Sequence, residues 1–266
     1  EPFSLNAVKT WRTKLFSMAT ETKKGIGKFF IDSSVTDGEG MRIAKDFLQE
    51  LLFAFARQSK KYIEHTQEAP FNYSERQIHS MLLPAIATLT DAFLMELPAT
   101  RKLRASGGNP KVASNGWVDY WCQYRNVDFL IELKHGFDAY RTETTRQTVL
   151  ADWKYMVSEQ IKSVKADARY LSQFSNGTIL LPIHLISVYE YCREGQERQS
   201  IENRDELRRI QKNYKTTLKP APNWSGMWML NRALTDQCYI ELESGYEYYP
   251  GVLMVSRVEG LIGNKA

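Results

Sequence analysis

The feature that most constrains the fold is a pair of strand-like segments within residues 116–135. Both segments are rich in β-branched, aromatic and aliphatic residues, which suit a pleated and partly buried surface. Arg125 and Asn126 lie between them, and Asn tolerates the left-handed backbone that a tight turn requires. We therefore expect a β-hairpin with a loop of two or four residues, because both lengths give the same register.

This register brings one acidic residue of each strand to the same patch. Asp119 is expected to face Glu132, with their Cβ atoms ~4.5–5.5 Å apart, and alternation puts Lys134 on the same face. Opposed carboxylates destabilise a hairpin unless something compensates, and a divalent cation with oxygen ligands is the natural candidate. The alternative is a solvated face on which charges simply alternate. Trp117 and Trp121 beside Asp119 argue against it and favour partial cover on both sides.

These residues resemble the signature of the PD-(D/E)xK nuclease superfamily, which has the restriction-endonuclease-like fold. The signature is an acidic residue on one strand and, after a hairpin, Glu-x-Lys on the next; Asp119 and Glu132-Leu133-Lys134 match it, with Val118 in place of the Pro. The resemblance covers roughly residues 70–190. It implies an α/β fold with a central mixed β-sheet flanked by helices.

Apolar periodicity predicts elements on both sides of the hairpin. One helix is expected from Met41, a second opens at Ser74 with Gln77 in a capping box, and a third runs from Thr144 to about Phe174. A buried strand is expected at residues 178–191, where Pro182 suggests an edge, a bulge or a late start, and terminal strands at 224–230, 237–243 and 249–257. We divide the chain into an N-terminal helical extension, residues 1–70, and a nuclease-like domain, residues 71–266.

Two helical residues are candidates for the same site. Glu75 lies on the side of its helix that carries Ile78 and Leu82, and the resemblance implies a Glu on a helix before the hairpin. The alternative is that Glu75 only favours the positive end of the helix dipole. Gln160 is the one polar residue on the inward face of the third helix. It either forms a hydrogen bond in the core or, as the resemblance implies, lies near the active site.

Basic residues gather in two further segments. Residues 98–115 are expected to form a loop that carries Arg101, Lys102, Arg104 and Lys111, four cations suited to phosphate contacts or to a solvated loop. The polar helix expected at residues 195–219 is either solvated or faces nucleic acid. The net charge of +4 permits a polyanionic partner without requiring one.

Composition narrows the class of protein. Hydrophobic residues make up 43% of the chain and charged residues 25%, as in ordinary globular proteins. Cys122, Cys192 and Cys238 lack the spacing of a zinc site or of a disulfide framework, which favours a reducing cytoplasm. No apolar run reaches the ~18 residues of a membrane span, so we expect a soluble protein without a membrane partner.

The resemblance implies a metal-dependent nuclease, an endonuclease acting on DNA, with products that carry a 5′-phosphate and a 3′-hydroxyl. Asp119, Glu132 and the Leu133 carbonyl would hold Mg²⁺, for which Mn²⁺ can substitute. Lys134 would orient water or stabilise developing charge, and Glu75 would complete the metal or water shell. Two alternatives stay open: a catalytically silent module that binds nucleic acid or protein, and a nuclease specific for RNA. A homodimer would suit cleavage of both strands.

Overall fold

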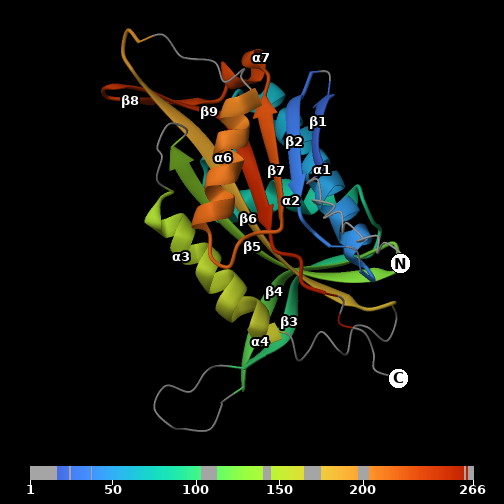
Figure 1. The fold of residues 1–266 in the computed structure, drawn as a ribbon. Helices are drawn as coiled ribbons and strands as arrows, with labels where there is room; N and C mark the ends of the chain where they lie inside the picture. The colour runs from blue at the N-terminus through green and yellow to red at the C-terminus, as the bar shows by residue number, and fades with distance from the viewer. Residues whose placement is uncertain are drawn as a thin grey trace, which may run out of the picture.

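A computed structural model describes residues 17–23, 25–36, 38–102, 113–139, 145–164, 175–196, 204–260 and 262. In these residues the chain forms one large mixed β-sheet between two layers of helices (Figure 1). The strand order is β1-β2-β7-β9-β6-β5-β4-β3, and the short strand β8 pairs with β9. Of the paired strands described, only β5 and β6 run parallel to each other. The α/β class expected from the sequence is confirmed.

The described residues contain nine strands and several helices and helical turns, with the following bounds. The strands are β1 (Ser17–Lys23), β2 (Gly27–Ser33), β3 (Phe93–Lys102), β4 (Ala113–Tyr124), β5 (Val127–Ala139), β6 (Thr178–Arg193), β7 (Trp224–Leu230), β8 (Tyr239–Leu242) and β9 (Gly245–Ser256). The helices are α1 (Met41–Thr66), the 3₁₀ turn η1 (Pro70–Asn72), α2 (Glu75–Ala87), α3 (Gln147–Tyr155), the π-helical turn η2 (Met156–Gln160), α4 (Ile161–Val164), α6 (Arg204–Thr217) and α7 (Arg232–Thr235).

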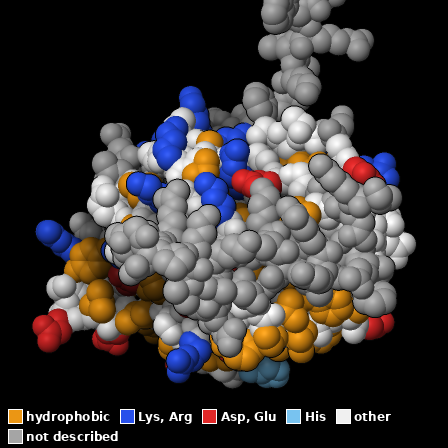
Figure 2. Space-filling view, turned by 90° about the horizontal axis from the view of Figure 1, so that it is seen from below, with side chains coloured by type: hydrophobic (Ala, Val, Ile, Leu, Met, Phe, Trp, Pro, Cys, Tyr) orange, Lys and Arg blue, Asp and Glu red, His pale blue; other side chains and the backbone are white. Residues whose placement is uncertain are grey.

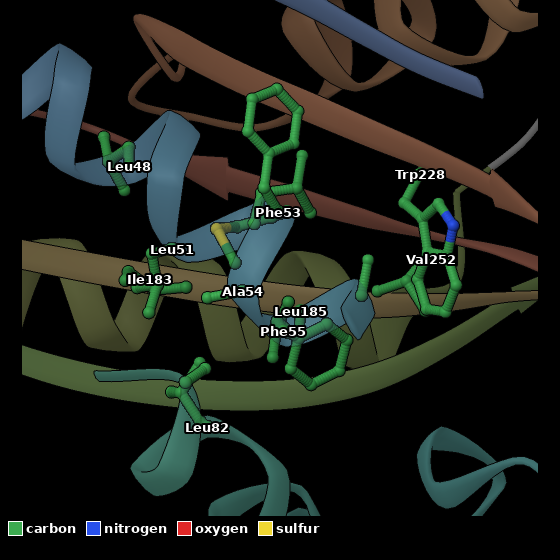
Figure 3. Close-up of a cluster of buried hydrophobic side chains, with 14 of the residues drawn as sticks. Leu48, Leu51, Phe53, Ala54, Phe55, Leu82, Ile183, Leu185, Trp228 and Val252 are labelled. Atoms are coloured by element: carbon green, nitrogen blue, oxygen red, sulfur yellow. The ribbon is translucent and has the colours of Figure 1, made fainter. Parts of the chain in front are cut away.

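Helices α1 and α2 cover one face of the sheet. The predicted stripe of α1 is buried here, and Figure 3 shows its Leu51 and Phe55 beside Leu82 of α2 and side chains from the strands beneath. Phe47 stacks on Phe129 of β5 with ring centroids 4.5 Å apart. This apolar layer fixes α2, and therefore its first residue, over β5.

Helices α3 and α6 cover the opposite face. Trp153 of α3 is fully buried among side chains of the central strands, and its indole N–H donates to the Pro220 carbonyl at 2.8 Å. Tyr214 of α6 packs in the same cluster, and Gln211 donates to the Phe30 carbonyl at 2.8 Å. Lys215 pairs with Asp32 at 2.7 Å. Helix α6 is thus a packed helix with a solvated outer side, not a wholly exposed one.

Strand β6 is buried on both faces, which explains its nearly continuous apolar sequence. Pro182 lies within it, although proline cannot donate a ladder hydrogen bond. The ladder between β6 and β9 begins only at Ile183, opposite Ser256. Of the alternatives for Pro182, the structure therefore favours a late start, on the β9 side.

Several predicted boundaries differ from the structure. The N-terminal region is not only helical, because β1 and β2 belong to the same sheet as the hairpin. The expected loop at residues 98–115 is shorter, since β3 continues to Lys102 and β4 begins at Ala113. The third helix, expected from Thr144 to about Phe174, begins at Gln147 and contains the π-helical turn η2, and residues 165–174 lie outside the described residues. The starts of α1 and α2 and the three terminal strands are confirmed within two residues or so, except that β9 begins earlier.

Among the described helices, none combines the length and the apolar character that crossing a membrane requires.

Candidate active site

The hairpin has the predicted register. Strands β4 and β5 pair from Tyr124 opposite Val127 to Tyr120 opposite Ile131. The loop is the two residues Arg125 and Asn126, whose φ angles are 48° and 61°. Two successive positive φ angles are the feature of a type I′ turn, whose twist matches that of the strands. The turn residues thus set which side chains oppose each other at the far end.

Strands β4 and β5 separate at the next position, so the direct pairing expected for Asp119 and Glu132 is wrong. Their ladder ends with Tyr120 and Ile131, whereas β5 stays paired with β6 as far as Ala139. The remainder of β4 continues with β3 alone, and Figure 1 shows these two strands leaving the body of the sheet. Among the described residues, one edge of β5 therefore has no neighbouring strand from Glu132 onward.

The two faces of the ribbon of β3 and β4 exchange places at Glu96 and Asp119. Met95 packs with the core beneath α1 and α2, but Leu97, two residues on, packs with the cluster around α4. Period-two alternation would put both on one face. Between them Glu96 has a φ of 56°, and neither it nor Asp119 opposite is part of the ladder. This left-handed residue lets Asp119 leave the ladder.

Two carboxylates bind the free edge of β5. Asp119 Oδ2 accepts the Leu133 N–H at 2.7 Å, and Glu75 Oε2 accepts the His135 N–H at 3.1 Å. These are alternate N–H groups on the edge that β4 has left. Since the N–H and C=O of one strand residue point to the same side, the Leu133 carbonyl also points to this edge.

Glu75 also pairs with Lys134. The Lys134 ammonium lies 3.1 Å from Oε1 of Glu75, and the two side chains are 22% and 35% exposed. Glu75 is the first residue of α2, so it lies in the positive field at the helix start as well as next to the lysine. The inward orientation expected for Glu75 is confirmed, and the dipole explanation accounts for only part of its setting. Ser74 is the N-cap but makes no side-chain capping bond, so the predicted capping box is wrong.

Gln160 meets Glu132 on the other side of the opening. Its Nε2 donates to Glu132 Oε2 at 2.8 Å, and Glu132 is fully buried. Its Oε1 is also buried and has no hydrogen-bond partner among the described residues. Gln160 ends the π-helical turn η2, a local geometry that is frequent at functional sites. The inward position predicted for Gln160 is confirmed, and its partner is Glu132 of the motif; a role in an active site stays a prediction.

The residues at the opening partly suit a metal ion. In the described part of the chain, no three His, Cys, Asp or Glu side chains are grouped to hold one. Glu75 is engaged with Lys134 and His135, which does not favour it as a direct ligand. The oxygen donors that suit Mg²⁺ are the Asp119 and Glu132 carboxylates, the Leu133 carbonyl and the orphaned Gln160 Oε1. Mg²⁺ takes few protein ligands and keeps several waters, so this set fits it.

Burial raises the pKa of Asp119 above its ordinary value. The Leu133 N–H and the positive charges of His79 and Lys134 act in the opposite direction, while the Glu75 carboxylate adds to the rise. Asp119 is therefore a desolvated carboxylate at the meeting point of other charged groups. Removing such a carboxylate from water has a cost that a bound cation can offset.

Two further residues lie near the site. His79 lies one turn after Glu75 on α2, shares a hydrogen bond with the Tyr120 hydroxyl, and is close enough to Asp119 to interact with its charge. Asp152 of α3 interacts with the charges of Lys134 and Glu75. The i+4 spacing of His79 from Glu75 suggests this position, with a structural or surface role as the alternative, but nothing in the sequence distinguishes Asp152 from a surface residue.

His135, which follows Lys134, donates its backbone N–H to Glu75, but its side chain lies in the other layer, where Nε2 contacts Ser187 Oγ at 2.9 Å. The backbone of Arg101 and Lys102 belongs to β3, and Arg104 and Lys111 lie outside the described residues. Trp117 is 59% exposed, so the partial cover expected for that residue is wrong.

The site was also compared with what is known of other proteins. Searches of protein-family models, curated proteins and solved structures found no match to this chain.

Proposed function

We propose that this chain is a metal-dependent nuclease that hydrolyses phosphodiester bonds in DNA and has a restriction-endonuclease-like core. One observation carries the proposal: Asp119, Glu132 and Lys134, the residues of the sequence motif, lie together where β4 leaves β5. Glu75 and Gln160 reach the same opening from helices on either side. Their convergence is hard to explain as a solvated strand face, because Glu132 is fully buried.

Each residue has a distinct task in this proposal. Asp119, Glu132, the Leu133 carbonyl and Gln160 Oε1 would hold Mg²⁺ or Mn²⁺. When bound, such an ion polarises the scissile phosphate and lowers the pKa of a water molecule. Lys134 stabilises negative charge that develops on the phosphate or orients the attacking water. Glu75 holds the Lys134 ammonium in place through the 3.1 Å contact and is a positioning residue rather than a ligand.

Endonucleolytic cleavage to a 5′-phosphate and a 3′-hydroxyl is the outcome that the motif implies. The same chemistry would act on RNA, so the substrate class requires an experiment.

A second candidate function has an observation of its own. In the described residues Lys134 is paired with Glu75, and no three-residue metal group is preformed. This arrangement favours a nuclease-like module that binds nucleic acid or protein without cutting it.

The deciding experiment is cleavage of supercoiled plasmid, linear duplex, single-stranded DNA and RNA with Mg²⁺ or Mn²⁺. Asp119→Asn and Lys134→Met are compared with Lys60→Met, the same chemical change at a lysine of α1 whose partner is Glu64. We expect cleavage by the parent and by Lys60→Met, and loss of it in the two site variants. Binding without cleavage by any folded form would instead support the silent module. Equal cleavage by all four would reject the site.

A further inference from the structure

We infer that His79 donates a proton to the oxygen that leaves phosphorus when the phosphodiester bond is hydrolysed, and that Tyr120 orients its ring. The inference rests on the proposed function, because it takes the opening at Asp119 as the place of cleavage. It adds a catalytic residue outside the sequence motif and names the group that supplies the proton of the 3′-hydroxyl product.

Hydrolysis to a 5′-phosphate and a 3′-hydroxyl requires a proton at the leaving oxygen, because an unprotonated alkoxide is a poor leaving group. The residues assigned so far have other tasks. Asp119 and Glu132 are assigned to a cation, and Lys134, which is paired with Glu75, to the phosphate or the attacking water. Histidine can carry a proton near neutral pH, which makes it the commonest general acid in enzymes.

His79 borders the opening from helix α2. It lies one turn after Glu75, ~6 Å along the helix axis, and residues four apart share one side of a helix. Glu75 itself reaches the opening, where it contacts the Lys134 ammonium and the His135 N–H. The charge of His79 is also close enough to Asp119 to act on the pKa of that carboxyl.

Tyr120 fixes one end of the His79 ring. Its hydroxyl shares a hydrogen bond with Nδ1, and the two ring centroids are 5.3 Å apart. Tyr120 is fully buried and ends the ladder of β4 and β5, directly after Asp119 in the chain. Burial raises the pKa of Tyr120, so its hydroxyl stays protonated and its oxygen can accept the Nδ1–H of an imidazolium.

The other end of the ring is available. His79 is only half-buried, and its Nε2 has no hydrogen-bond partner among the residues that the structure describes. One ring nitrogen held by a second residue, with the other nitrogen left for the substrate, is the arrangement of a general acid or base.

The two layers of helices approach the opening from opposite sides. Gln160 meets Glu132 from η2, whereas His79 comes from α2 on the other face of the sheet. In an in-line displacement the attacking and leaving oxygens lie on opposite sides of phosphorus. An attack from the side of Glu132 and Gln160 therefore directs the leaving oxygen toward His79.

The proposed step conserves atoms and charge. Water bonds to phosphorus, the bond to the 3′-oxygen breaks with its electron pair on that oxygen, and His79 transfers its Nε2 proton to it. The proton lost by the attacking water passes to the solvent, from which His79 is protonated again.

The surface at this end of the molecule suits a phosphate backbone. Seen from below, where β3 and β4 leave the sheet, the molecule has both cationic and hydrophobic side chains at its surface (Figure 2). Cationic side chains attract phosphates whatever the sequence of the nucleic acid. The departure of β4 that forms the opening thus lies at an end to which a phosphodiester backbone is attracted.

The test compares two leaving atoms at one defined linkage of an oligonucleotide. One version has the ordinary linkage, and in the other a sulfur atom replaces the bridging 3′-oxygen, because a thiolate leaves without a proton. Sequence and strandedness are those of the best substrate in the cleavage screen, and both versions are cut with Mn²⁺. The variants are His79→Gln and Tyr120→Phe, and the control is His65→Gln, the same change at an exposed histidine of α1.

We expect His79→Gln to cleave the ordinary linkage about 100-fold more slowly than the parent and the sulfur linkage at nearly the parental rate. Tyr120→Phe should show a smaller loss with the same selectivity, because Tyr120 is a positioning residue that acts through His79. His65→Gln should match the parent at both linkages. Each ratio compares two substrates for one protein preparation, so it does not depend on the fraction that is folded.

Three results would overturn parts of the inference. Parental cleavage of the ordinary linkage by His79→Gln would exclude proton donation, and equal losses at both linkages would reduce His79 to a structural or binding role. A Tyr120→Phe protein identical to the parent would exclude the orienting role of Tyr120. In these cases cleavage by the parent leaves the nuclease proposal standing, whereas a parent that cuts neither linkage rejects the proposed function and the proton transfer with it.

Discussion

Two of the buried carboxylates of strand β5, Asp138 and Glu132, are held in very different ways. Asp138 accepts hydrogen bonds from the Tyr214 hydroxyl and, at 3.0 Å, from the Ala139 N–H, deep under α6. Glu132 is buried equally well, but it lies where β4 departs, and its amide partner Gln160 keeps an oxygen without a partner. Asp138 thus belongs to a hydrogen-bond network beneath packed side chains, whereas Glu132 borders the opening.

The difference separates stability from function. Burial raises the pKa of Asp138, and the Tyr214 hydrogen bond and the Arg146 charge offset part of that rise. At the opening, Lys134 and Glu75 remain partly exposed, and Gln160 Oε1 has unused acceptor capacity among the described residues. A buried polar atom that lacks a partner is costly, and this one borders the residues proposed to bind a metal ion.

The largest effect expected is on activity at the opening. Glu132→Gln keeps the shape of the side chain but removes its charge, and we expect cleavage to fall at least about 100-fold, because cation binding and charge stabilisation are both weakened. Thermal unfolding of the metal-free protein should change little. The comparison is broken if Glu132→Gln cuts at the parental rate, measured as kcat/KM on the best substrate of the cleavage screen.

The opposite pattern is expected at Asp138. Tyr214→Phe removes a donor to a buried carboxylate, so the free energy of unfolding should fall by ~1–3 kcal/mol, as measured in urea. Activity per folded molecule should be unchanged. A Tyr214→Phe protein of full stability but low activity would contradict the assignment of stability to Asp138 and of activity to Glu132.

His184 provides a smaller test within the same sheet. It lies in register with Lys134, is fully buried, and neither ring nitrogen has a partner among the described residues. Burial lowers the pKa of His184 to about 3, below the ordinary value of 6.5. As pH falls from 6.5 toward 3, the unfolded chain therefore binds a proton that the folded protein does not, and stability is lost, by up to ~1.4 kcal/mol per pH unit.

Replacement of His184 by leucine removes the buried ring nitrogens that lack partners and the group that is protonated only in the unfolded chain. His184→Leu should raise the free energy of unfolding by ~1–2 kcal/mol at pH 7, and its advantage should grow at pH 5. Urea denaturation at the two pH values measures this. Burial also lowers the pKa of His135, to about 4, so the pH dependence of the variant should be reduced rather than abolished. Identical pH slopes in parent and variant would contradict the account of His184.

The smallest effect concerns the backbone at Glu96. A left-handed conformation costs a non-glycine residue about 1 kcal/mol, so Glu96→Gly should retain or slightly increase the melting temperature. Glu96→Ala, which keeps a Cβ but not the carboxylate, is the matched control and should not show the gain. A clear loss of stability in Glu96→Gly but not in Glu96→Ala would show that the left-handed backbone at Glu96 is not strained.

The sequence predicted those parts of the site that depend on local pattern. Apolar alternation and the Arg125-Asn126 turn predicted the hairpin register, which brings Asp119 and Glu132 to the first positions beyond the ladder, because a hairpin is fixed by neighbouring residues. Helical spacing likewise brought Gln160 to the correct face. The residue-70 domain boundary stays a prediction.

The parts that were missed depend on distant contacts. Strands β1 and β2 form because β7 offers them an edge, which residues 17–33 do not themselves reveal. The departure of β4 from β5 requires a left-handed glutamate, a conformation that side-chain chemistry does not favour. The proximity of Asp152 to Lys134 arises from the packing of α3 on the sheet, through Trp153 and other apolar side chains.

The two carboxylates on the free edge of β5 also affect whether another chain can pair with that edge. An unpaired row of N–H and C=O groups is a template on which another chain can add a strand. Asp119 and Glu75 occupy the N–H groups of Leu133 and His135 and place negative charge along that row. The acidic residues of the opening thus disfavour the addition of a further strand at this edge, and this effect does not depend on any catalytic role.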